Sequence, residues 1–348
     1  MLEPPTLHDA QIIATLDAAF DLHAAQLDFL PVGNDATSWA FRAVDQTGAA
    51  WFLKVRRGAI APAGLLVPRL LSDMGIAGVV APVPARTGAL ATPVPGTDFA
   101  LVLYPFVHGV QGMEIGLTHG QWRTLGQTLR RIHDAAHTSA LPAAIPREPF
   151  RPPWRDTVLQ VDALLAADAW DAADPTVAAF AALWQARRDE ILALVARTDE
   201  LGALLRAQDP ALVLCHADIH TANVLVDDAG ALHIVDWDGA LLAPRERDLM
   251  FMVGGEVEPA RMTAATRVFL EGYGPVTLDP LALAYYRYEW VVQEVGDYGA
   301  RLLLTPDLGQ AGRAQALAEF EQLFAPGDVV DEAYASANNL SALDGQHG

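Results

Sequence analysis

The chain has 348 residues, a formal net charge of -20 at pH 7 and 52% hydrophobic residues. This length suits two domains or one large domain with two lobes. The negative charge argues against nucleic acid and anionic membranes as partners, because their phosphates would repel the chain, and it favours a cationic small molecule. The sequence has one cysteine, Cys215, so we expect no internal disulfide bond. It shows no export signal and no run of 18 apolar residues, and we expect a cytoplasmic protein. The expected oligomeric state is a monomer or a homodimer.

The beginning of the chain predicts an antiparallel sheet preceded by a helix. Helical periodicity covers residues 8–26, and residues 61–74 predict a second helix. Gly33 and Asn34 lie in a loop between the first two expected strands, where backbone N–H groups could face the phosphates of a nucleotide. Runs rich in apolar and β-branched residues predict strands at 27–31, 38–44, 49–55, 79–83, 88–91 and 99–104.

One basic residue differs from all the others. The 23 lysine and arginine residues are all arginines except Lys54, which lies inside the apolar run Trp51–Val55. A compact ammonium on a slim stem can enter a pocket and contact phosphate oxygens where a planar guanidinium would not fit. We therefore predict a functional role for Lys54 rather than the chance survival of one surface lysine.

The rest of the chain predicts a mainly helical region. The strand at 99–104 leads into a segment read as a hinge, so the first lobe is expected to end at residue 106. Residues 141–154 contain five prolines and predict an extended connection. The tail 326–348 has little to bury and is expected to be mobile. Helical periodicity predicts helices at 118–136, 155–168, 174–206, 245–253, 258–272, 280–303 and 308–324.

Residues 212–240 combine short apolar runs with clustered polar residues. The runs at 212–214, 224–226 and 232–235 are too short for helices and predict strands, and Asp228-Ala-Gly230 predicts the turn between the last two. A hairpin could gather the neighbouring polar side chains at one end of these strands. They are His216, Asp218, His220, Asn223, Asp236 and Asp238.

Three interpretations of this cluster fit the residues less well. A zinc site would need Cys215, His216 and His220 to converge, yet adjacent residues of an extended chain point to opposite faces. Cys215 follows an apolar run and is expected to be a small buried hydrophobe. A serine hydrolase would need a nucleophile on a sharp turn, and no Gly-x-Ser-x-Gly occurs here. A purely structural cluster would bury acids and amides at a high cost in free energy.

Phosphoryl transfer is the interpretation that the spacing favours. Asp218 and Asn223 have the Asp-x-x-x-x-Asn spacing of a kinase catalytic loop, in which the aspartate accepts the proton of the attacking hydroxyl and the asparagine binds magnesium. Asp236, thirteen residues after Asn223, stands where a second magnesium ligand belongs, and hard oxygen ligands suit Mg²⁺. Lys54 would then hold the α- and β-phosphates of a nucleotide.

These residues resemble those of the aminoglycoside phosphotransferase and choline-kinase-like group. The loop of that group commonly reads His-Gly-Asp-Leu-His-x-x-Asn, and its metal aspartate lies in Ile-Asp-Trp. The corresponding stretches here are His216-Ala-Asp-Ile-His-Thr-Ala-Asn223 and Val235-Asp-Trp237. A histidine such as His220 is typical of the small-molecule kinases, since protein kinases usually have lysine there. Tyr285–Tyr298 and Pro68–Leu71 are most similar to the spectinomycin-phosphotransferase-like branch.

The resemblance covers most of residues 27–300 and implies an α+β, bilobal, protein-kinase-like fold. A small antiparallel β-sheet would form an N-lobe over residues 1–106, and residues 107–325 would form a larger, mainly helical C-lobe. The implied cofactor is Mg²⁺, the phosphoryl donor is ATP or GTP, and the acceptor is a small molecule such as an aminoglycoside or aminocyclitol. A metabolite such as homoserine, choline or fructosamine is the alternative acceptor. A non-catalytic nucleotide-binding regulator is the alternative outside enzymes.

The resemblance also implies a role for each candidate residue. Asp218 would be the catalytic base, Asn223 and Asp236 the metal ligands, and His216, His220 and Asp248 supports of the loop. The candidates for binding the nucleotide are Lys54, Gly33, Asn34, Tyr104, Phe106 and Val107. The candidates for binding the acceptor are Asp238, Glu289, Glu294 and Asp297, and the last three are equally compatible with a solvated surface.

The surroundings of Lys54 depart from the pattern of the group. Kinases generally pair this lysine with a glutamate on the following helix. Residues 59–72 contain no acid, and Asp73 lies near the end of the expected helix. The partner could be Asp35 or Asp73, or Lys54 could be held by nucleotide phosphate and Asp236 alone.

Overall fold

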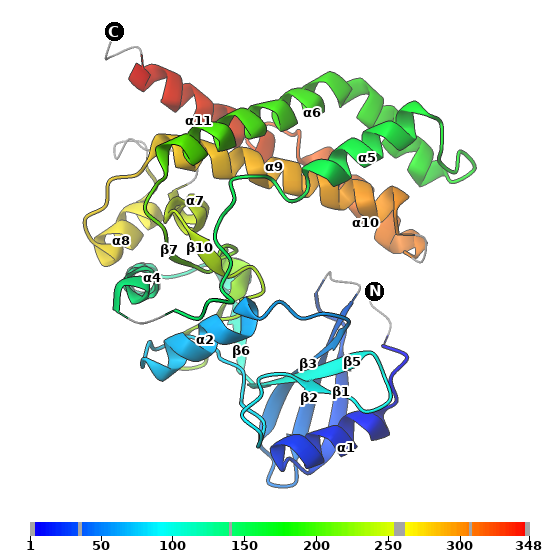
Figure 1. Cartoon of the computed structure of the whole chain (residues 1–348), viewed down its shortest axis with the longest axis vertical. Helices are drawn as coiled ribbons and strands as arrows, with labels where there is room; N and C mark the ends of the chain where they lie inside the picture. The colour runs from blue at the N-terminus through cyan, green and yellow to red at the C-terminus, as the bar shows by residue number, and fades with distance from the viewer. Residues whose placement is uncertain (1–3, 34–36, 139–140, 254–261, 306–307, 345–348) are drawn as a thin grey trace. The chain divides into compact units, whose positions relative to one another are not determined.

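The computed structural model describes residues 4–33, 37–138, 141–253, 262–305 and 308–344. The chain begins with a helix and a five-stranded antiparallel sheet and continues mainly as helices (Figure 1), which confirms the predicted α+β class. It divides into two compact units, and the first segment of the first unit runs past residue 106 to Pro146. The first unit consists of Met1–Pro146, Val213–Leu242 and Val268–Pro275, and the second of Arg147–Leu212, Ala243–Arg267 and Val276–Gly348.

The five-stranded sheet has the order β1-β2-β3-β5-β4, and all neighbouring strands are antiparallel. Strand β3 is central and places Lys54 between Ala40 of β2 and Val102 of β5. The meander with Lys54 on its third strand is therefore confirmed. The strands are β1 (Ala24–Leu30), β2 (Ser38–Asp45), β3 (Ala50–Arg57), β4 (Thr92–Pro93) and β5 (Phe99–Pro105).

The two faces of this sheet differ in chemistry. Leu53 and Val55 of β3 point to one face, where they join Ile12 and Leu16 of helix α1 (Asp9–Phe20) in a hydrophobic core. Each large apolar side chain buried in such a core contributes about 1.5–3 kcal/mol to stability. Successive side chains of a strand point to opposite faces, so Lys54 lies on the face away from α1. Core residues of the neighbouring strands alternate in the same way and include Trp39, Phe41, Ala43, Phe99, Leu101 and Leu103.

Short strands carry residues 212–240, as predicted. Strand β8 (Val224–Asp227) pairs with β9 (Leu232–Ile234) on one side and with β6 (Gly109–Gln111) on the other. Strand β7 (Val213–Cys215) pairs with β10 (Leu241–Ala243). The turn between β8 and β9 is also as expected, since Gly230 has a φ of 80° and its N–H donates to the Asp227 carbonyl at 2.8 Å.

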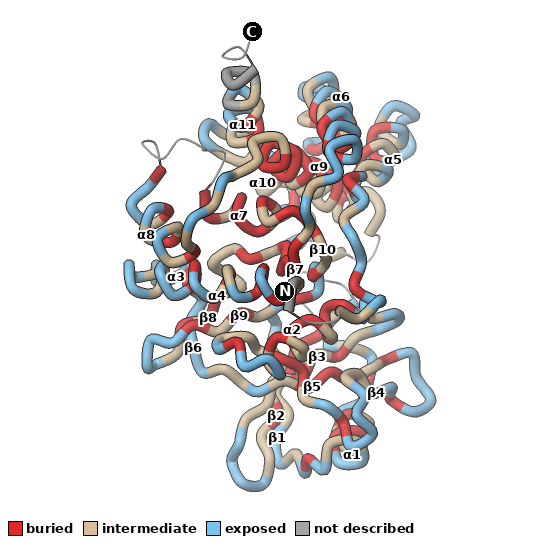
Figure 2. Tube along the Cα trace, turned by 60° about the vertical axis from the view of Figure 1, so that its left-hand side comes forward, coloured by how far each residue is buried: buried red, intermediate tan, exposed pale blue. Residues whose placement is uncertain are grey.

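Helix α9 (Pro280–Leu303) is the centre of the second unit. Helices on several of its sides pack against it, and its many buried residues are red in Figure 2. Phe180 and Trp184 of α6 and Phe320 of α10 form an aromatic cluster with ring centroids between 4.9 and 5.9 Å apart. The helices that pack on α9 are α5 (Arg155–Ala166), α6 (Pro175–Gln208), α7 (Glu246–Val253), α10 (Gln310–Gln322) and α11 (Val329–Asp344).

The remaining predicted helices are also present. Residues 61–74 contain α2 (Ala63–Asp73), and residues 118–136 contain most of α4 (His119–Thr138). The helix predicted at 258–272 corresponds to α8 (Ala264–Tyr273), while its first residues lie outside the described part of the chain. Two short elements that periodicity did not predict are α3 (Gly112–Ile115) and the 3₁₀ helix η1 (Thr221–Asn223).

Helix α9 begins at an aspartate cap. The Asp279 carboxylate accepts hydrogen bonds from the N–H groups of Leu281 at 2.9 Å and Ala282 at 3.4 Å, which the first turn of a helix otherwise leaves unpaired. Asp279→Ala is expected to lower the free energy of unfolding by about 1–2 kcal/mol, whereas Asp279→Asn keeps an acceptor oxygen and should cost only part of this. Denaturant unfolding of the three proteins measures the difference. Equal stability of the alanine variant and the natural chain would contradict the assignment.

Glu246, the first residue of α7, is a buried acid next to that cap. It is 4% exposed and accepts a hydrogen bond from the Asp279 N–H at 3.0 Å. Burial raises the pKa of Glu246, and hydrogen bonds from the amides of Asp279 and of Glu246 itself offset this only in part. The folded chain therefore binds more protons than the unfolded chain just above the ordinary glutamate pKa, and stability falls as pH rises through this window.

Glu246→Gln keeps the acceptor oxygen and removes the charge. We expect this variant to have a higher Tm than the natural chain at about pH 7, and no advantage below about pH 4, where the glutamate is protonated in both states. Thermal unfolding at the two pH values tests this. Glu321→Gln, at an exposed position of α10, is the matched control. A lower Tm for Glu246→Gln at neutral pH would show that the charged form is the stabilising one.

Two predicted strands are wrong. Residues 79–83 form only an isolated bridge at Val79, because Pro82 has no N–H to continue a ladder. Residues 88–91 follow a tight turn, in which Gly88 has a φ of 84° and donates to the Ala85 carbonyl at 2.8 Å. The fourth strand of the chain, β4, begins only at Thr92.

The expectation of a mobile tail over 326–348 is corrected for the residues that form α11. Val330, Ala333 and Ser336 are buried, and Glu332 forms an ion pair with Arg287 of α9. These contacts give the segment apolar surface to bury, which the sequence interpretation overlooked.

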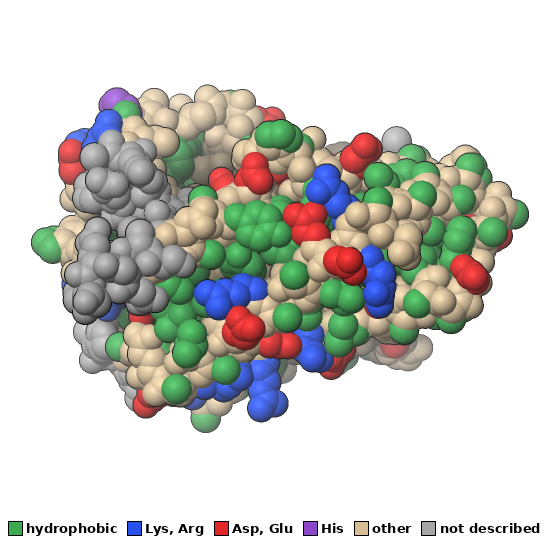
Figure 3. All heavy atoms as spheres, turned by 90° about the horizontal axis from the view of Figure 1, so that it is seen from above, with side chains coloured by type: hydrophobic (Ala, Val, Ile, Leu, Met, Phe, Trp, Pro, Cys, Tyr) green, Lys and Arg blue, Asp and Glu red, His purple; other side chains and the backbone are tan. Residues whose placement is uncertain are grey.

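Among the described residues, no helix is long and apolar enough to cross a membrane. The face of the molecule in Figure 3 shows acidic side chains next to arginines rather than a surface of one sign. The acidic excess of the composition is therefore not gathered into a single patch on that face.

Candidate functional site

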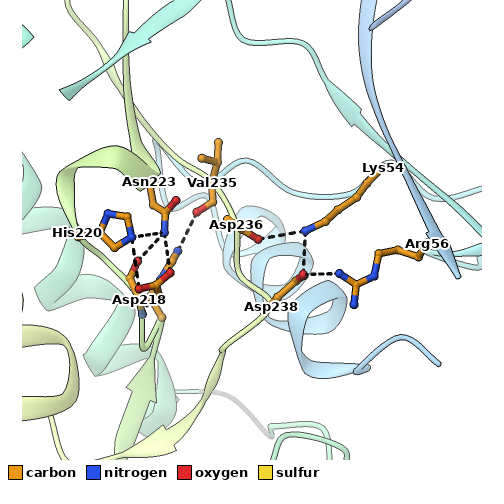
Figure 4. A network of polar contacts seen from close by, with 9 residues as sticks. Lys54, Arg56, Asp218, His220, Asn223, Val235, Asp236 and Asp238 are labelled. Atoms are coloured by element: carbon orange, nitrogen blue, oxygen red, sulfur yellow. Dashed lines mark hydrogen bonds and ion pairs between the residues drawn. The ribbon is translucent and has the colours of Figure 1, made fainter. Parts of the chain in front are cut away.

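Lys54 meets two carboxylates of the segment after β9 (Figure 4). Its Nζ lies 3.1 Å from Asp236 Oδ1 and 2.8 Å from Asp238 Oδ2. The Lys54 side chain is 18% exposed, whereas those of Asp236 and Asp238 are 51% and 42% exposed. The predicted convergence of Lys54 and Asp236, which are 182 positions apart in sequence, is present in the fold.

The charge of Lys54 is stabilised by these neighbours. Burial by itself lowers the pKa of a lysine, but the charges of Asp236 and Asp238 and their hydrogen bonds outweigh it, so the pKa of Lys54 lies above its ordinary value. The phenol of Tyr104 lies near the same acids. Burial raises the pKa of Tyr104, and the charges of Asp238 and Asp236 raise it further. At neutral pH this site therefore presents a cation next to a neutral phenol.

Asp218 and Asn223 lie together in the loop between β7 and β8. The Asn223 side-chain N–H donates to the Asp218 carbonyl at 2.8 Å and to Asp218 Oδ2 at 3.0 Å. His220 Nε2 lies 3.4 Å from Asp218 Oδ1, and the Asp218 side chain is 48% exposed. With its nitrogen turned to Asp218, the amide of Asn223 directs its oxygen away from that residue, as Figure 4 shows.

His216 connects this loop to the segment that carries Asp236. It is fully buried, its Nδ1 accepts the Asp218 backbone N–H at 3.2 Å, and its Nε2 lies 2.9 Å from the Val235 carbonyl. Because Nδ1 accepts, the ring proton is on Nε2 and is donated to Val235. The imidazole also lies against Trp237, with ring centroids 4.5 Å apart. Both nitrogens are therefore engaged, which rules out the weaker interpretation of His216 as a zinc ligand.

Two residues of this site have left-handed backbone conformations. Ala217 has a φ of 72° and Asp236 a φ of 60°. Such values cost a non-glycine residue roughly 1–2 kcal/mol, and strain of this kind is concentrated at functional sites. The corresponding loop of the resembling group commonly has glycine at the position of Ala217, and glycine adopts a positive φ at little cost. The cost in free energy at this position therefore arises from the alanine of this chain.

The other nucleotide-binding candidates lie near the end of the sheet or outside the described residues. Gly33 has a φ of 91° in the loop after β1, while Asn34 and Asp35 lie outside the described part of the chain. Phe106 and Val107 follow the last residue of β5, as expected of a hinge. The guanidinium of Arg42 lies 5.5 Å from the centroid of the Phe106 ring.

The remaining candidates belong to the second unit. Asp248 is fully buried in α7. On α9, Glu289 is 4% exposed and paired with Arg247, and Glu294 accepts hydrogen bonds from Trp290 at 3.1 Å and Tyr298 at 2.6 Å. Asp297 is paired with Arg301 at 2.6 Å. Each of the three acids on α9 therefore already has a partner within its own unit.

Sequence reasoning missed Arg56 as a member of this site. Its Nη1 lies 3.1 Å from Asp238 Oδ2, and its side chain is 16% exposed. Arg56 follows Lys54 by two positions on β3, so the two side chains lie on the same face of the sheet. Because residues two positions apart on a strand share a face, a strand that contains Lys54 predicts that Arg56 lies beside it.

Comparison with known proteins agrees with this geometry. The sequence profile of the phosphotransferase enzyme family matches residues 28–286. Protein StrN of Streptomyces griseus is 31% identical over 286 residues, which cover 79% of this chain and 79% of that protein. The crystal structure of spectinomycin phosphotransferase APH(9)-Ia in complex with ADP and spectinomycin has a TM-score of 0.80 and 30% identity, covering 96% of this chain and 99% of that one.

A more distant match has the same fold. The amicoumacin kinase hAmiN, in complex with AMP-PNP, Ca²⁺ and Ami, has a TM-score of 0.60 and 19% identity, and the match covers 94% of both chains. The protein-kinase-like fold expected from the sequence is thereby confirmed. The chain belongs to the phosphotransferase enzyme family, and is a small-molecule kinase.

Proposed function

We propose that the enzyme transfers the γ-phosphoryl group of ATP or GTP to a hydroxyl of a small cationic acceptor, an aminocyclitol or aminoglycoside of the spectinomycin type. The observation that carries the proposal is the ion pair between Lys54 and Asp236. His216 connects the two segments that hold the acids, because it binds both the Asp218 backbone and the carbonyl of Val235, the residue before Asp236. Lys54, Asp218 and Asp236 belong to one unit of the fold, which supports their proposed roles as phosphate-binding cation, catalytic base and metal ligand.

The donor atoms suit magnesium. Asp236 offers a half-exposed carboxylate and Asn223 an amide oxygen, both hard ligands of the kind that Mg²⁺ prefers. We assign the metal to these two residues. When bound, the ion would neutralise negative charge on the phosphates of the donor.

The residues of the chain perform the rest of the reaction. Lys54 binds phosphate oxygens through its ammonium, and Gly33, Tyr104, Phe106 and Val107 line the nucleotide side of the sheet and hinge. Asp218 orients the acceptor hydroxyl and takes its proton, and its exposed carboxylate is accessible for this. His216 and His220 hold the loop by hydrogen bonds, and Asp248 is proposed as a further support. Positioning and electrostatic stabilisation supply most of the rate enhancement in such transfers.

The acceptor assignment follows the relatives and the charge. The spectinomycin phosphotransferase binds ADP and spectinomycin, at 30% identity to this chain. The net charge of -20 favours a cationic acceptor over an acidic one. The acids Glu289, Glu294 and Asp297 on α9 all have partners within their own unit, so the acceptor assignment does not rest on them. The reaction would take place in the cytoplasm, where nucleoside triphosphates are available.

The test is phosphoryl transfer with a panel of acceptors. ATP and GTP, each with Mg²⁺, would be supplied with spectinomycin, other aminocyclitols and aminoglycosides, homoserine, choline and fructosamine, and the phosphorylated product identified by mass spectrometry. We expect transfer to an aminocyclitol by the natural chain, loss of transfer in the Asp218→Ala variant, and loss on chelation of the metal. Transfer to homoserine, choline or fructosamine alone would overturn the acceptor class. Nucleotide binding without transfer to any hydroxyl would favour a regulator.

A further inference from the structure

The helix after strand β3 supplies no partner for Lys54. Kinases pair this lysine with a glutamate on the next helix, but Asp73 is the one acid in α2, and it is the last residue of that helix. Asp73 is bound by Arg69 instead, at 3.1 Å from Nε and 2.6 Å from Nη2. The position that a helix acid would fill is therefore taken by another group.

Asp238 is that group in this fold. Its Oδ2 accepts from Lys54 Nζ at 2.8 Å and from Arg56 Nη1 at 3.1 Å, so one oxygen joins both cations of the strand. Figure 4 shows the two basic side chains reaching Asp238 from β3. Charge-assisted hydrogen bonds are roughly twice as strong as neutral ones. Both cations are more than four-fifths buried, whereas the Asp238 side chain is 42% exposed, so solvent screens the pairing in part.

Helix α2 still takes part, but through its backbone. A Cβ atom added to Gly64, the second residue of α2, would lie 3.0 Å from the Asp238 Cα, 3.2 Å from Asp238 Oδ1 and 3.2 Å from the Trp237 carbonyl. The absence of a side chain at Gly64 thus allows the first turn of α2 to pack directly on residues 237–238. The positive end of the helix dipole is then close to the Asp238 carboxylate.

The register of the sheet shows where the two cations lie. Lys54 is opposite Ala40 of β2, and Arg56 is opposite Ser38, the first residue of that strand. Arg56 is therefore closer than Lys54 to the loop that joins β1 to β2. Both residues lie on the face of the sheet away from the hydrophobic core, which is the face proposed to bind the nucleotide.

We propose that Asp238 positions Lys54 and Arg56 together for the nucleotide phosphates, replacing the helix acid that other kinases use, and that Arg56 is a second phosphate-directed cation. This inference rests on the proposed phosphotransferase function. It also gives Asp238 a role different from contact with the acceptor. If the oxygens of Asp236 are taken by a metal ion, Asp238 is the carboxylate that still holds Lys54 in place.

The pairing can be measured without ligand. Denaturant unfolding of the nucleotide-free chain, Asp238→Asn, Arg56→Gln and the double variant forms a double-mutant cycle. We expect the two substitutions to be non-additive, with a coupling of roughly tenfold in the unfolding equilibrium constant. Additive effects would overturn the shared pairing, whatever the enzyme does with nucleotides. Gly64→Ala supplies an independent check, and stability equal to that of the natural chain would contradict the close contact with Asp238.

The positioning role is measured by nucleotide binding. Calorimetry with ADP and Mg²⁺ is expected to show about tenfold weaker binding for Asp238→Asn and for Arg56→Gln, with kcat at saturating nucleotide changed less than affinity. Asp238→Glu should recover part of the affinity, because it restores the negative charge. Asp73→Asn is the matched control, since this acid is paired with Arg69 rather than with Lys54 or Arg56, and it should bind ADP like the natural chain.

Two results would overturn the positioning role. One is an ADP affinity for Asp238→Asn within about twofold of the natural chain, which is less than the loss of a charge-assisted hydrogen bond would cause. The other is a loss of kcat with unchanged nucleotide affinity, which would place Asp238 on the acceptor side. Failure of the natural chain to bind ADP would instead overturn the proposed function, while the ligand-free cycle would still decide whether Asp238 joins the two cations.

Discussion

Asp218→Asn is expected to lower kcat for phosphoryl transfer by about 10²–10⁴-fold, the range that general acid–base catalysis contributes. The amide keeps an acceptor oxygen for Asn223, so the loop should retain its conformation while losing the base. Lys54 pairs with Asp236 and Asp238, whereas Asp218 contacts Asn223 and His220, so nucleotide affinity should remain close to that of the natural chain. Steady-state kinetics at saturating donor and acceptor, together with ADP binding, measure the two quantities separately.

The matched control for this substitution is Asp227→Asn. Asp227 lies at the end of β8 and binds the N–H groups of its own turn and His233, away from the loop that carries Asp218. Its replacement should leave kcat nearly unchanged. A loss of less than about tenfold for Asp218→Asn would remove Asp218 from the role of base.

Asp236→Asn is expected to abolish most of the magnesium dependence of nucleotide binding and to lower kcat/KM by about 10²–10³-fold, the usual cost of removing one group that stabilises transition-state charge. The fold should survive, because asparagine tolerates the left-handed conformation that Asp236 adopts at a φ of 60°. Titration of ATP binding with Mg²⁺ provides the measurement. Asp228→Asn, in the turn between β8 and β9, is the matched control, because it removes the same charge outside the site.

An unchanged magnesium titration for Asp236→Asn would show that the metal is held elsewhere. The substitution also removes one of the two carboxylates that hold Lys54, so some loss of metal-independent affinity is expected as well. Comparison of ADP binding with and without magnesium separates the two contributions.

The sequence predicted those parts of the site that depend on residue type and local spacing. Lys54 was found because it is the one lysine, and the Asp218–Asn223 spacing because a single loop fixes it. The strands on either side were predicted because short apolar runs bounded by turn residues have few alternatives.

The parts that could not be predicted depend on long-range contacts. The pairing of Asp238 with Lys54 joins residues 184 positions apart, and no local pattern encodes it. Helix α11 packs on α9, and its buried Val330 and Ala333 are separated by Asp331 and Glu332, so they form no continuous apolar run. The error at residues 79–83 has a local cause, because Pro82 interrupts hydrogen bonding within an otherwise apolar run.

Along strand β3, residues that stabilise the core alternate with residues that face the site. Leu53 and Val55 are fully buried in the core against α1, while Lys54 and Arg56 between and beside them face the site. A substitution at a site-facing position therefore leaves the side chains of the core positions unchanged. Substitutions on the site face can therefore change the charge that this strand presents, while the core residues go on providing the stability of the sheet.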